Sequence, residues 1–167
     1  MKESYRFRKA MPKEIPAVYA LIMERVAWMD RVGIRQWNVT KYDKRYPLDY
    51  YIGRQQAGEL FVLEDLETGQ LLCVGALFRE DSRWKDPAPA YYLHHFAAAP
   101  DAKGAGSIFL QQAEQYTATC RMQYLRLDSA VGNKKLETYY TDRGYVEAGY
   151  CTDGLYQGVL RQKKLFK

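Results

Sequence analysis

The pattern of apolar and polar positions predicts a fold that mixes strands and helices. Tyr5–Lys9 alternates between the two kinds of residue, as a half-buried strand does. After Pro12 the apolar residues recur at helical spacing, and this helix is expected to run to about Met29, before the break at Gly33. A short second helix is expected after Pro47.

The remaining segments alternate between strands, turns and two amphipathic helices. The strands Leu60–Leu63 and Leu71–Phe78 are expected to form a hairpin around Glu67–Gln70, because this stretch is rich in turn-forming residues. The last two strands are expected to form another hairpin around Asp153-Gly154 for the same reason. Residues 79–90 are polar and contain two prolines, which predicts a surface loop. The expected strands are Leu60–Leu63, Leu71–Phe78, Tyr91–Ala99, Tyr124–Ala130, Tyr145–Thr152 and Tyr156–Arg161.

The order of these elements predicts a mixed α/β sheet. Each of the two later helices lies between strands, so we expect both to be crossovers between parallel neighbours. No internal repeat, low-complexity segment or linker interrupts the chain, and its 167 residues suit one domain over 1–167.

Composition narrows the classes of function. A hydrophobic fraction of 47% with 27% charged residues is ordinary for a globular protein. The net charge of +5 is spread without a long basic run, so we expect no nucleic-acid partner. No stretch approaches the ~20 apolar residues that cross a bilayer, and Met1–Arg6 lacks the apolar core of a signal peptide. The three cysteines fit neither a disulfide nor a zinc pattern, which indicates a cytoplasmic protein without a metal.

A glycine turn precedes the first of the two later helices and is a candidate anion site. Its sequence is Lys103-Gly104-Ala105-Gly106-Ser107. A helix N-terminus leaves backbone N–H groups unpaired and carries the positive end of the helix dipole, and glycines let an anion approach these groups closely. The lysine adds a cation and the serine a hydroxyl. The same pattern also fits a flexible helix entry without a ligand.

Several segments, taken in order, resemble the acetyl-CoA-binding core of the GNAT-type N-acetyltransferases. They are Tyr92–Asp101, Gly104–Ser107, Ala113–Tyr116, Tyr124–Asp128, and Asn133 through Tyr140 to Gly144-Tyr145, which matches the pattern Asn-x6-Tyr-x3-Gly-aromatic. The resemblance implies a twisted, mostly antiparallel sheet of about seven strands, in which the fourth and fifth strands are parallel and splayed, with four helices on both faces. It also implies acetyl-CoA as co-substrate and a single N-acetyltransferase domain.

The resemblance assigns the cofactor contacts. Phe96, Ala97 and Ala98 are expected along the pantetheine arm, where splayed strands expose backbone groups that the cofactor's amides can pair with. The same residues also fit a plain core strand. The glycine turn from Lys103 to Ser107 is expected at the diphosphate. Asn133 is expected near the cofactor, and it fits equally well as a simple N-cap.

One position departs from the family's pattern. The family usually has Arg or Gln three residues before the first glycine of the turn, where this chain has Asp101. Counting forward from Pro100 instead puts Lys103 in that place. We therefore expect the backbone N–H groups to do most of the phosphate binding, with Lys103 assisting.

Tyr140 is the expected general acid. A phenol with a pKa of ~10 is reasonably matched to an alkyl thiol with a pKa of ~8.5, so a hydrogen-bonded tyrosine can return a proton to the leaving thiolate. Tyr140 also counts among the expected cofactor contacts. Tyr139 is its rival on the same helix.

His94 is the candidate for general base or acceptor contact. Strand alternation predicts that Tyr92, His94 and Phe96 share one face of the strand and that His95 lies on the other. A strand histidine also fits a satisfied core residue. Glu80 and Asp128 are alternative bases.

The acceptor pocket is expected around the early helices and the loop at Gly33–Asn38. Trp37, Arg35 and Tyr46 are expected to line it, together with Tyr92.

The expected reaction is direct attack of a small-molecule or peptide amine on the thioester. The resemblance also makes a homodimer a possible assembly. A catalytically silent acyl-CoA-binding module of the same fold is the main alternative, and a basic RNA-binding domain is the third.

Overall fold

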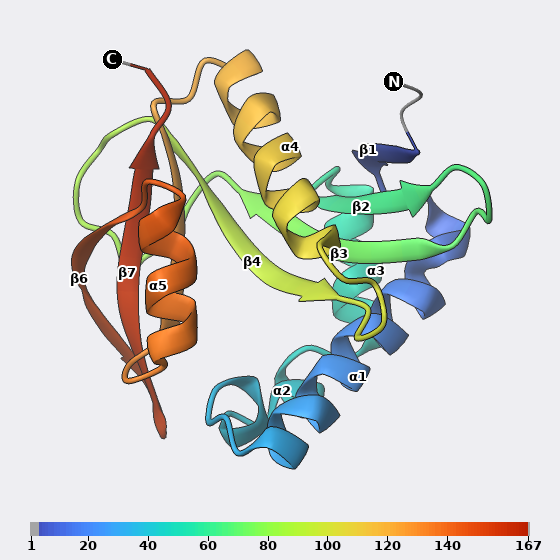
Figure 1. The fold of residues 1–167 in the computed structure, drawn as a ribbon, viewed down its shortest axis with the longest axis horizontal. Helices are drawn as coiled ribbons and strands as arrows, with labels where there is room; N and C mark the ends of the chain where they lie inside the picture. The colour runs from blue at the N-terminus through green and yellow to red at the C-terminus, as the bar shows by residue number, and fades with distance from the viewer. Residues whose placement is uncertain (1–3, 167) are drawn as a thin grey trace.

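A computed structural model shows residues 4–166 as one seven-stranded sheet with helices on both faces (Figure 1). The described residues do not include Met1–Glu3 or Lys167. The expectations about a signal peptide and about net charge drew in part on these four residues. The strands are β1 (Tyr5–Lys9), β2 (Leu60–Asp65), β3 (Leu71–Phe78), β4 (Ala90–Ala98), β5 (Tyr124–Ala130), β6 (Val146–Asp153) and β7 (Tyr156–Lys164). The helices are α1 (Ile15–Val32), α2 (Tyr42–Arg45), α3 (Leu48–Gln56), α4 (Ala105–Thr119) and α5 (Lys134–Asp142), with short 3₁₀ turns at Pro12–Glu14 and Trp37–Val39.

The sheet order is β1-β2-β3-β4-β5-β7-β6, and β4–β5 is its parallel pair. The predicted mixed sheet with parallel fourth and fifth strands is therefore confirmed. The prediction that both later helices connect parallel neighbours is correct only for α4. After α5 the chain enters β6 at the sheet edge, and β7 returns between β6 and β5, antiparallel to both.

The helices cover the two faces of the sheet unequally. In Figure 1, α4 and α5 lie in front of the sheet, and α1 to α3 lie behind and below it. Helix α1 runs three residues beyond the expected end, to a left-handed Gly33. Residues 4–166 contain five α-helices rather than the expected four. The helix that was not predicted is α2, which has only four residues and therefore too little periodicity to be detected in the sequence.

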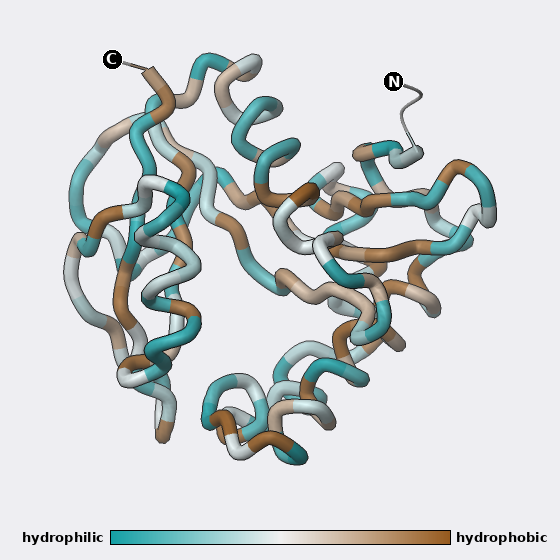
Figure 2. Tube along the Cα trace, in the orientation of Figure 1, coloured by the Kyte–Doolittle hydropathy of each residue, from teal (hydrophilic) through white to brown (hydrophobic). Residues whose placement is uncertain are grey.

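Each face of the sheet has its own apolar core. On the α4 side, Phe109, Leu110 and Leu93 are part of one buried cluster, and on the α1 side Val18 and Ile22 are part of another. Figure 2 shows hydrophilic and hydrophobic stretches alternating along α1 and α4, as expected for helices that bury one face. Burial on both faces explains why the central strands read as nearly continuous apolar runs in the sequence.

A β-bulge interrupts the pairing of β3 with β4. Val74 pairs with Ala97 and Ala76 with His94, so Gly75 alone faces two residues of β4. One of these two, His95, has a φ of 54°, in the left-handed region. The predicted alternation of side chains is therefore wrong at this point. Both histidine rings pack near Phe78, while Phe96 stacks on Phe109 of α4 on the other face.

Gly75→Ala tests how tightly the bulge packs against α4. An added Cβ would lie 2.8 Å from two ring carbons of the fully buried Phe109 and 2.9 Å from Leu93 Cδ1. We expect the free energy of unfolding to fall by about 1–3 kcal/mol, measured by chemical denaturation. The control is Gly53→Ala in α3, where a Cβ would meet nothing within 4 Å and the helix should gain slightly in stability. Equal stability of the two variants would contradict tight packing at Gly75.

Candidate functional site

A cleft opens where β4 and β5 part. The two strands pair only from Ala90–Tyr92 to Tyr124–Arg126, and beyond these residues neither strand has a partner on the side that faces the other. The cleft has a volume of about 890 Å³. It is lined by residues of β4 and β5, by the start of α4, by α5 and, at the other end, by α1, α2, the end of β6 and the start of β7.

Arg126 holds the two strands together at the closed end of the cleft. Its guanidinium is 1% exposed and forms two hydrogen bonds of 2.8 Å with the carboxylate of Asp86. It also donates to the hydroxyl of Tyr92 at 3.2 Å and lies over the ring of Trp84. Tyr92 was expected to contact the acceptor. The structure instead turns it away from the cleft lining and toward Arg126, where it braces the strand pair.

The glycine turn forms the start of α4, at the edge of the cleft. Gly104 has a φ of 82° and is the N-cap, and Ala105 is buried in the core. Within residues 4–166, the N–H groups of Gly106 and Ser107 have no hydrogen-bond acceptor. A Cβ on Gly106 would contact Phe96 and Ala98, which also line the cleft. Ala97 is fully buried and packs toward α1, so only two of the three expected pantetheine contacts line the cleft.

Neither Asp101 nor Lys103 places its charge in this part of the cleft, because both side chains are exposed and do not line it. A different cation reaches the start of α4. Arg143, at the end of α5, donates to Ser107 Oγ at 2.7 Å and lies 3.6 Å above the centre of the Tyr139 ring. Sequence reasoning missed Arg143, although it directly precedes the glycine that ends the Asn-x6-Tyr-x3-Gly pattern.

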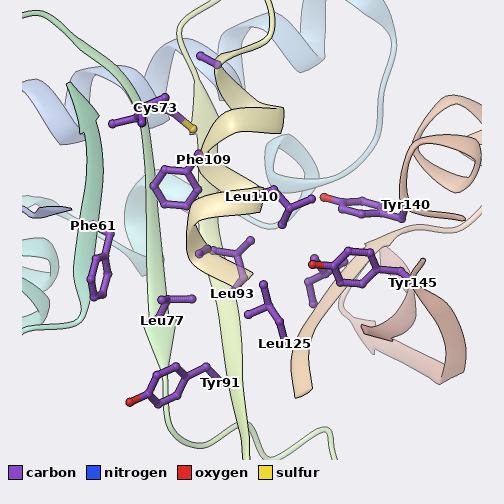
Figure 3. Close-up of a cluster of buried hydrophobic side chains, with 14 residues drawn as sticks. Phe61, Cys73, Leu77, Tyr91, Leu93, Phe109, Leu110, Leu125, Tyr140 and Tyr145 are labelled. Carbon is purple, nitrogen blue, oxygen red and sulfur yellow. The ribbon is translucent and has the colours of Figure 1, made fainter. Parts of the chain in front are cut away.

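Helix α5 positions Tyr140 at the cleft. The side chain of Asn133 accepts a hydrogen bond from the N–H of Leu136, so it is the N-cap, and it also lines the cleft. Tyr140 follows seven residues later and lies edge-on to Tyr139 and Tyr145. Figure 3 shows the rings of Tyr140 and Tyr145 extending side by side from this half of the molecule toward the apolar side chains around α4 and β4.

The two tyrosines differ in their access to the cleft. Tyr140 lines it, and its hydroxyl has no hydrogen-bond partner among residues 4–166. The hydroxyl of Tyr145 is sealed in the core without a partner. Burial raises the pKa of Tyr140 above its usual value, and nearby Tyr139 and Asp128 add to the shift. The Tyr140 phenol is therefore protonated at neutral pH and can act as a donor.

A chain of charged groups links His94 to the far wall of the cleft. His94 Nε2 lies 3.0 Å from Asp81 Oδ2, and Arg83 Nη2 lies 2.9 Å from the same oxygen. Arg83 also lies 3.0 Å from Asp128 Oδ1 on β5. Burial opposes ionisation of Asp81, but the hydrogen bonds from His94 and Arg83 outweigh it and hold the pKa of the carboxyl well below its usual range. Asp81 and Arg83 lie in the segment expected to be a plain surface loop, so sequence reasoning missed both.

His95 lies in a cage of tyrosines beside this chain. Its Nδ1 is hydrogen-bonded to the hydroxyl of Tyr42, and its Nε2 lies 3.0 Å from the hydroxyl of Tyr50. Burial lowers the pKa of His95 to about 3, and the charges of His94 and Arg54 add to the shift. The ring is therefore neutral, so it donates to one hydroxyl and accepts from the other.

Aromatic residues line the open end of the cleft. Trp37 stacks on Tyr42 with their ring centres 4.6 Å apart, and Trp37 and Tyr46 both line the cleft. Arg35 is exposed and does not line it. Arg45 of α2 forms an ion pair with Asp153 of β6 across this end.

Two further findings concern the part of the chain that the structure describes. It contains no helix with the length and apolar character of a membrane span. It also contains no group of three or more side chains suited to bind a metal.

Comparisons with solved structures identify the fold. An acetyltransferase of the GNAT family from Streptococcus agalactiae is 22% identical with a TM-score of 0.81, and the match covers 100% of this chain and 99% of that chain. A GNAT-family acetyltransferase from Listeria monocytogenes is 23% identical with a TM-score of 0.77, over 96% and 94% of the two chains. A putative acetyltransferase from Salmonella typhimurium, solved with its cofactor acetyl-CoA, is 15% identical with a TM-score of 0.68, over 99% and 96%. No family model and no curated protein matches the sequence. The chain thus has the fold of the GNAT acetyltransferases, as the sequence motifs predicted.

The neutral state of His95 predicts a pH dependence of stability. Unfolding raises its pKa from about 3 to 6.5, so the unfolded chain binds the extra proton and stability falls as the pH drops below about 6.5. Between pH 7 and pH 5 this group alone should account for a loss of about 2 kcal/mol. His95→Gln removes the titrating group, so its free energy of unfolding should fall less than that of the unaltered protein over the same range. Parallel pH curves from chemical denaturation would contradict a neutral His95.

Proposed function

We propose that this protein is an acetyl-CoA-dependent N-acetyltransferase that acts on a primary amine. One observation carries the proposal. The parallel strands β4 and β5 diverge around a cleft that runs from the N-terminus of α4 to the aromatic residues of α1 and α2, and Tyr140 lines it. A cleft of this kind can bind acetyl-CoA from one end and the amine from the other, so that the two substrates meet near Tyr140.

The end of the cleft near α4 suits the co-substrate. The free N–H groups of Gly106 and Ser107 and the nearby guanidinium of Arg143 offer hydrogen bonds and positive charge to a diphosphate. The unpaired edge of β4 next to Phe96 and Ala98 offers backbone groups to the amides of pantetheine. The solved structures of this fold that are named as acetyl-CoA or coenzyme A complexes support the same assignment.

Tyr140 is assigned as the general acid. The amine nitrogen attacks the thioester carbonyl carbon and the C–S bond breaks, so the leaving sulfur takes a proton. A protonated phenol that lines the cleft and has no other hydrogen-bond partner in residues 4–166 is free to donate it. Tyr139 is less suitable because its hydroxyl is hydrogen-bonded to Ser107.

His94 is assigned as the general base, with Asp81 as its positioning residue. When Nε2–H donates to Asp81, the lone pair of the neutral ring is on Nδ1, which has no hydrogen-bond partner among the described residues. This nitrogen can accept the proton that the attacking amine loses. Asp81 also stabilises the imidazolium that forms. Asp128 is already engaged by Arg83 and Tyr156, which makes it a poor alternative base.

The buried cysteines favour direct transfer to the amine over a covalent acetyl-enzyme intermediate. Cys73 and Cys151 are buried, and burial raises the pKa of both thiols. Neither is therefore a good nucleophile at neutral pH.

The proposal is tested by titrating the full chain with acetyl-CoA in a calorimeter and then screening amines by thiol release. Binding with turnover of at least one amine supports an enzyme. Binding without turnover of any amine would indicate an acyl-CoA-binding module instead, and the absence of binding would overturn the proposal altogether.

Tyr140→Phe should lower kcat by about 10²- to 10⁴-fold, the range usual for loss of a general acid, with little change in the affinity for acetyl-CoA. Tyr145→Phe is the matched control. It removes a hydroxyl from the neighbouring ring, and because that hydroxyl is buried without a partner, turnover should persist. Steady-state kinetics with both variants decides the question, since equal loss in the two would point to packing rather than to proton transfer.

Asp81→Asn should lower kcat with little change in the affinity for acetyl-CoA, because the variant loses the carboxylate that orients the His94 ring and faces it when it takes up the proton. Glu80→Gln is the control, since Glu80 is exposed, lines the same cleft and is the other candidate base. Steady-state kinetics with both variants separates the candidates, since kcat should be nearly unchanged in Glu80→Gln. A larger loss of kcat in Glu80→Gln than in Asp81→Asn would transfer the role of base to Glu80.

A further inference from the structure

Helix α1 carries a charged residue within its buried face. The buried residues of the helix include Val18, Leu21, Ile22 and Met29, which recur at the spacing of one helix face. Arg25 occupies the position between Ile22 and Met29 in this series, where an apolar residue would continue the stripe. At this point α1 passes under the open cleft, and Arg25, Trp28 and Met29 all line it.

The guanidinium of Arg25 has no anionic partner in the described chain. No carboxylate of residues 4–166 lies within 4.0 Å of it, and none of them accepts a hydrogen bond from it. It lies 4.5 Å from the centre of the Trp28 ring. Burial lowers the pKa of Arg25, which reflects the cost of holding a charge there without compensation.

The other charges within the cleft are compensated. Arg83 is paired with Asp81 and Asp128, and Arg45 is paired with Asp153. Two lining residues that form no ion pair within residues 4–166, Glu80 and Lys135, are exposed to solvent. Among the residues that the structure describes, Arg25 is therefore the one uncompensated charge inside the cleft.

We infer that Arg25 binds a carboxylate of the acceptor, so that the substrates are amines that also carry a carboxylate, as amino acids do. This inference rests on the proposed function. A guanidinium offers two parallel N–H donors that match a carboxylate, and partial burial strengthens the pairing. The acceptor is a better source of this anion than the diphosphate, because α1 and the candidate diphosphate site at the start of α4 lie on opposite faces of the sheet (Figure 1).

The test compares each of a panel of L-amino acids with its carboxamide, using acetyl-CoA and thiol release. Carboxyl-free amines such as spermidine serve as a third set. For the unaltered protein, kcat/KM for the best amino acid should exceed that for its carboxamide by about 10- to 100-fold, the value of one charged hydrogen-bonded pair. Arg25→Gln should lower kcat/KM for the acid by the same factor and leave that for the amide unchanged.

Arg31→Gln is the matched control, since Arg31 is an exposed arginine on the same helix and should be replaceable without effect. Thermal melting of both variants verifies that they fold, and calorimetry with acetyl-CoA reports on the co-substrate. A preference for carboxamides, turnover of carboxyl-free amines alone, or weaker acetyl-CoA binding in Arg25→Gln would each overturn the inference and leave the proposed function intact. Absence of acetyl-CoA binding in the unaltered protein would overturn both.

Discussion

The separation of β4 from β5 is the constraint on which the rest of the structure depends. Parallel strands that part expose backbone N–H and C=O groups, and such groups need other partners. Arg126 fixes the point at which pairing stops by joining Asp86, Tyr92 and Gln162 around both strands. The bulge at His95 bends β4 beyond that point. The cleft between the two strands follows from these two features.

Buried polar groups connect the two halves of the sheet across this gap. The series from His94 through Asp81 and Arg83 to Asp128 ends at Tyr156 of β7, whose hydroxyl donates to Asp128 at 2.6 Å. Every ionised member of the series faces an opposite charge or a donor, so the low dielectric strengthens the network rather than penalising it. The high tyrosine content has a similar explanation, since several of the 15 tyrosines present hydroxyls to the cleft or to His95.

The strands, hairpins, glycine turn and Asn-capped helix were predictable because each depends on residues close together in the sequence. The features that were missed depend on residues far apart. The bulge requires β3 to present Gly75 opposite β4, the role of Asp81 requires its loop to fold back onto His94, and β7 lies between β5 and β6 only because of the sheet's overall order. Arg143 and Arg25 were not singled out in the sequence, because their roles depend on a cleft that distant segments build. Tyr92 was misplaced because alternation specifies a face of the sheet and not a partner.

The bulge adds one residue to β4 and leaves the faces of the other side chains unchanged. With His95 set aside, Tyr91, Leu93, Phe96 and Ala98 belong to the core on the α4 side, while Ala97 and Ala99 belong to the core on the α1 side. The strand would then alternate without interruption, and each remaining side chain would keep its present face. His95 is thus one residue of excess length in an otherwise regular strand. The extra residue bends β4 just past the point where its pairing with β5 ends, and it does so without changing the face of any other side chain.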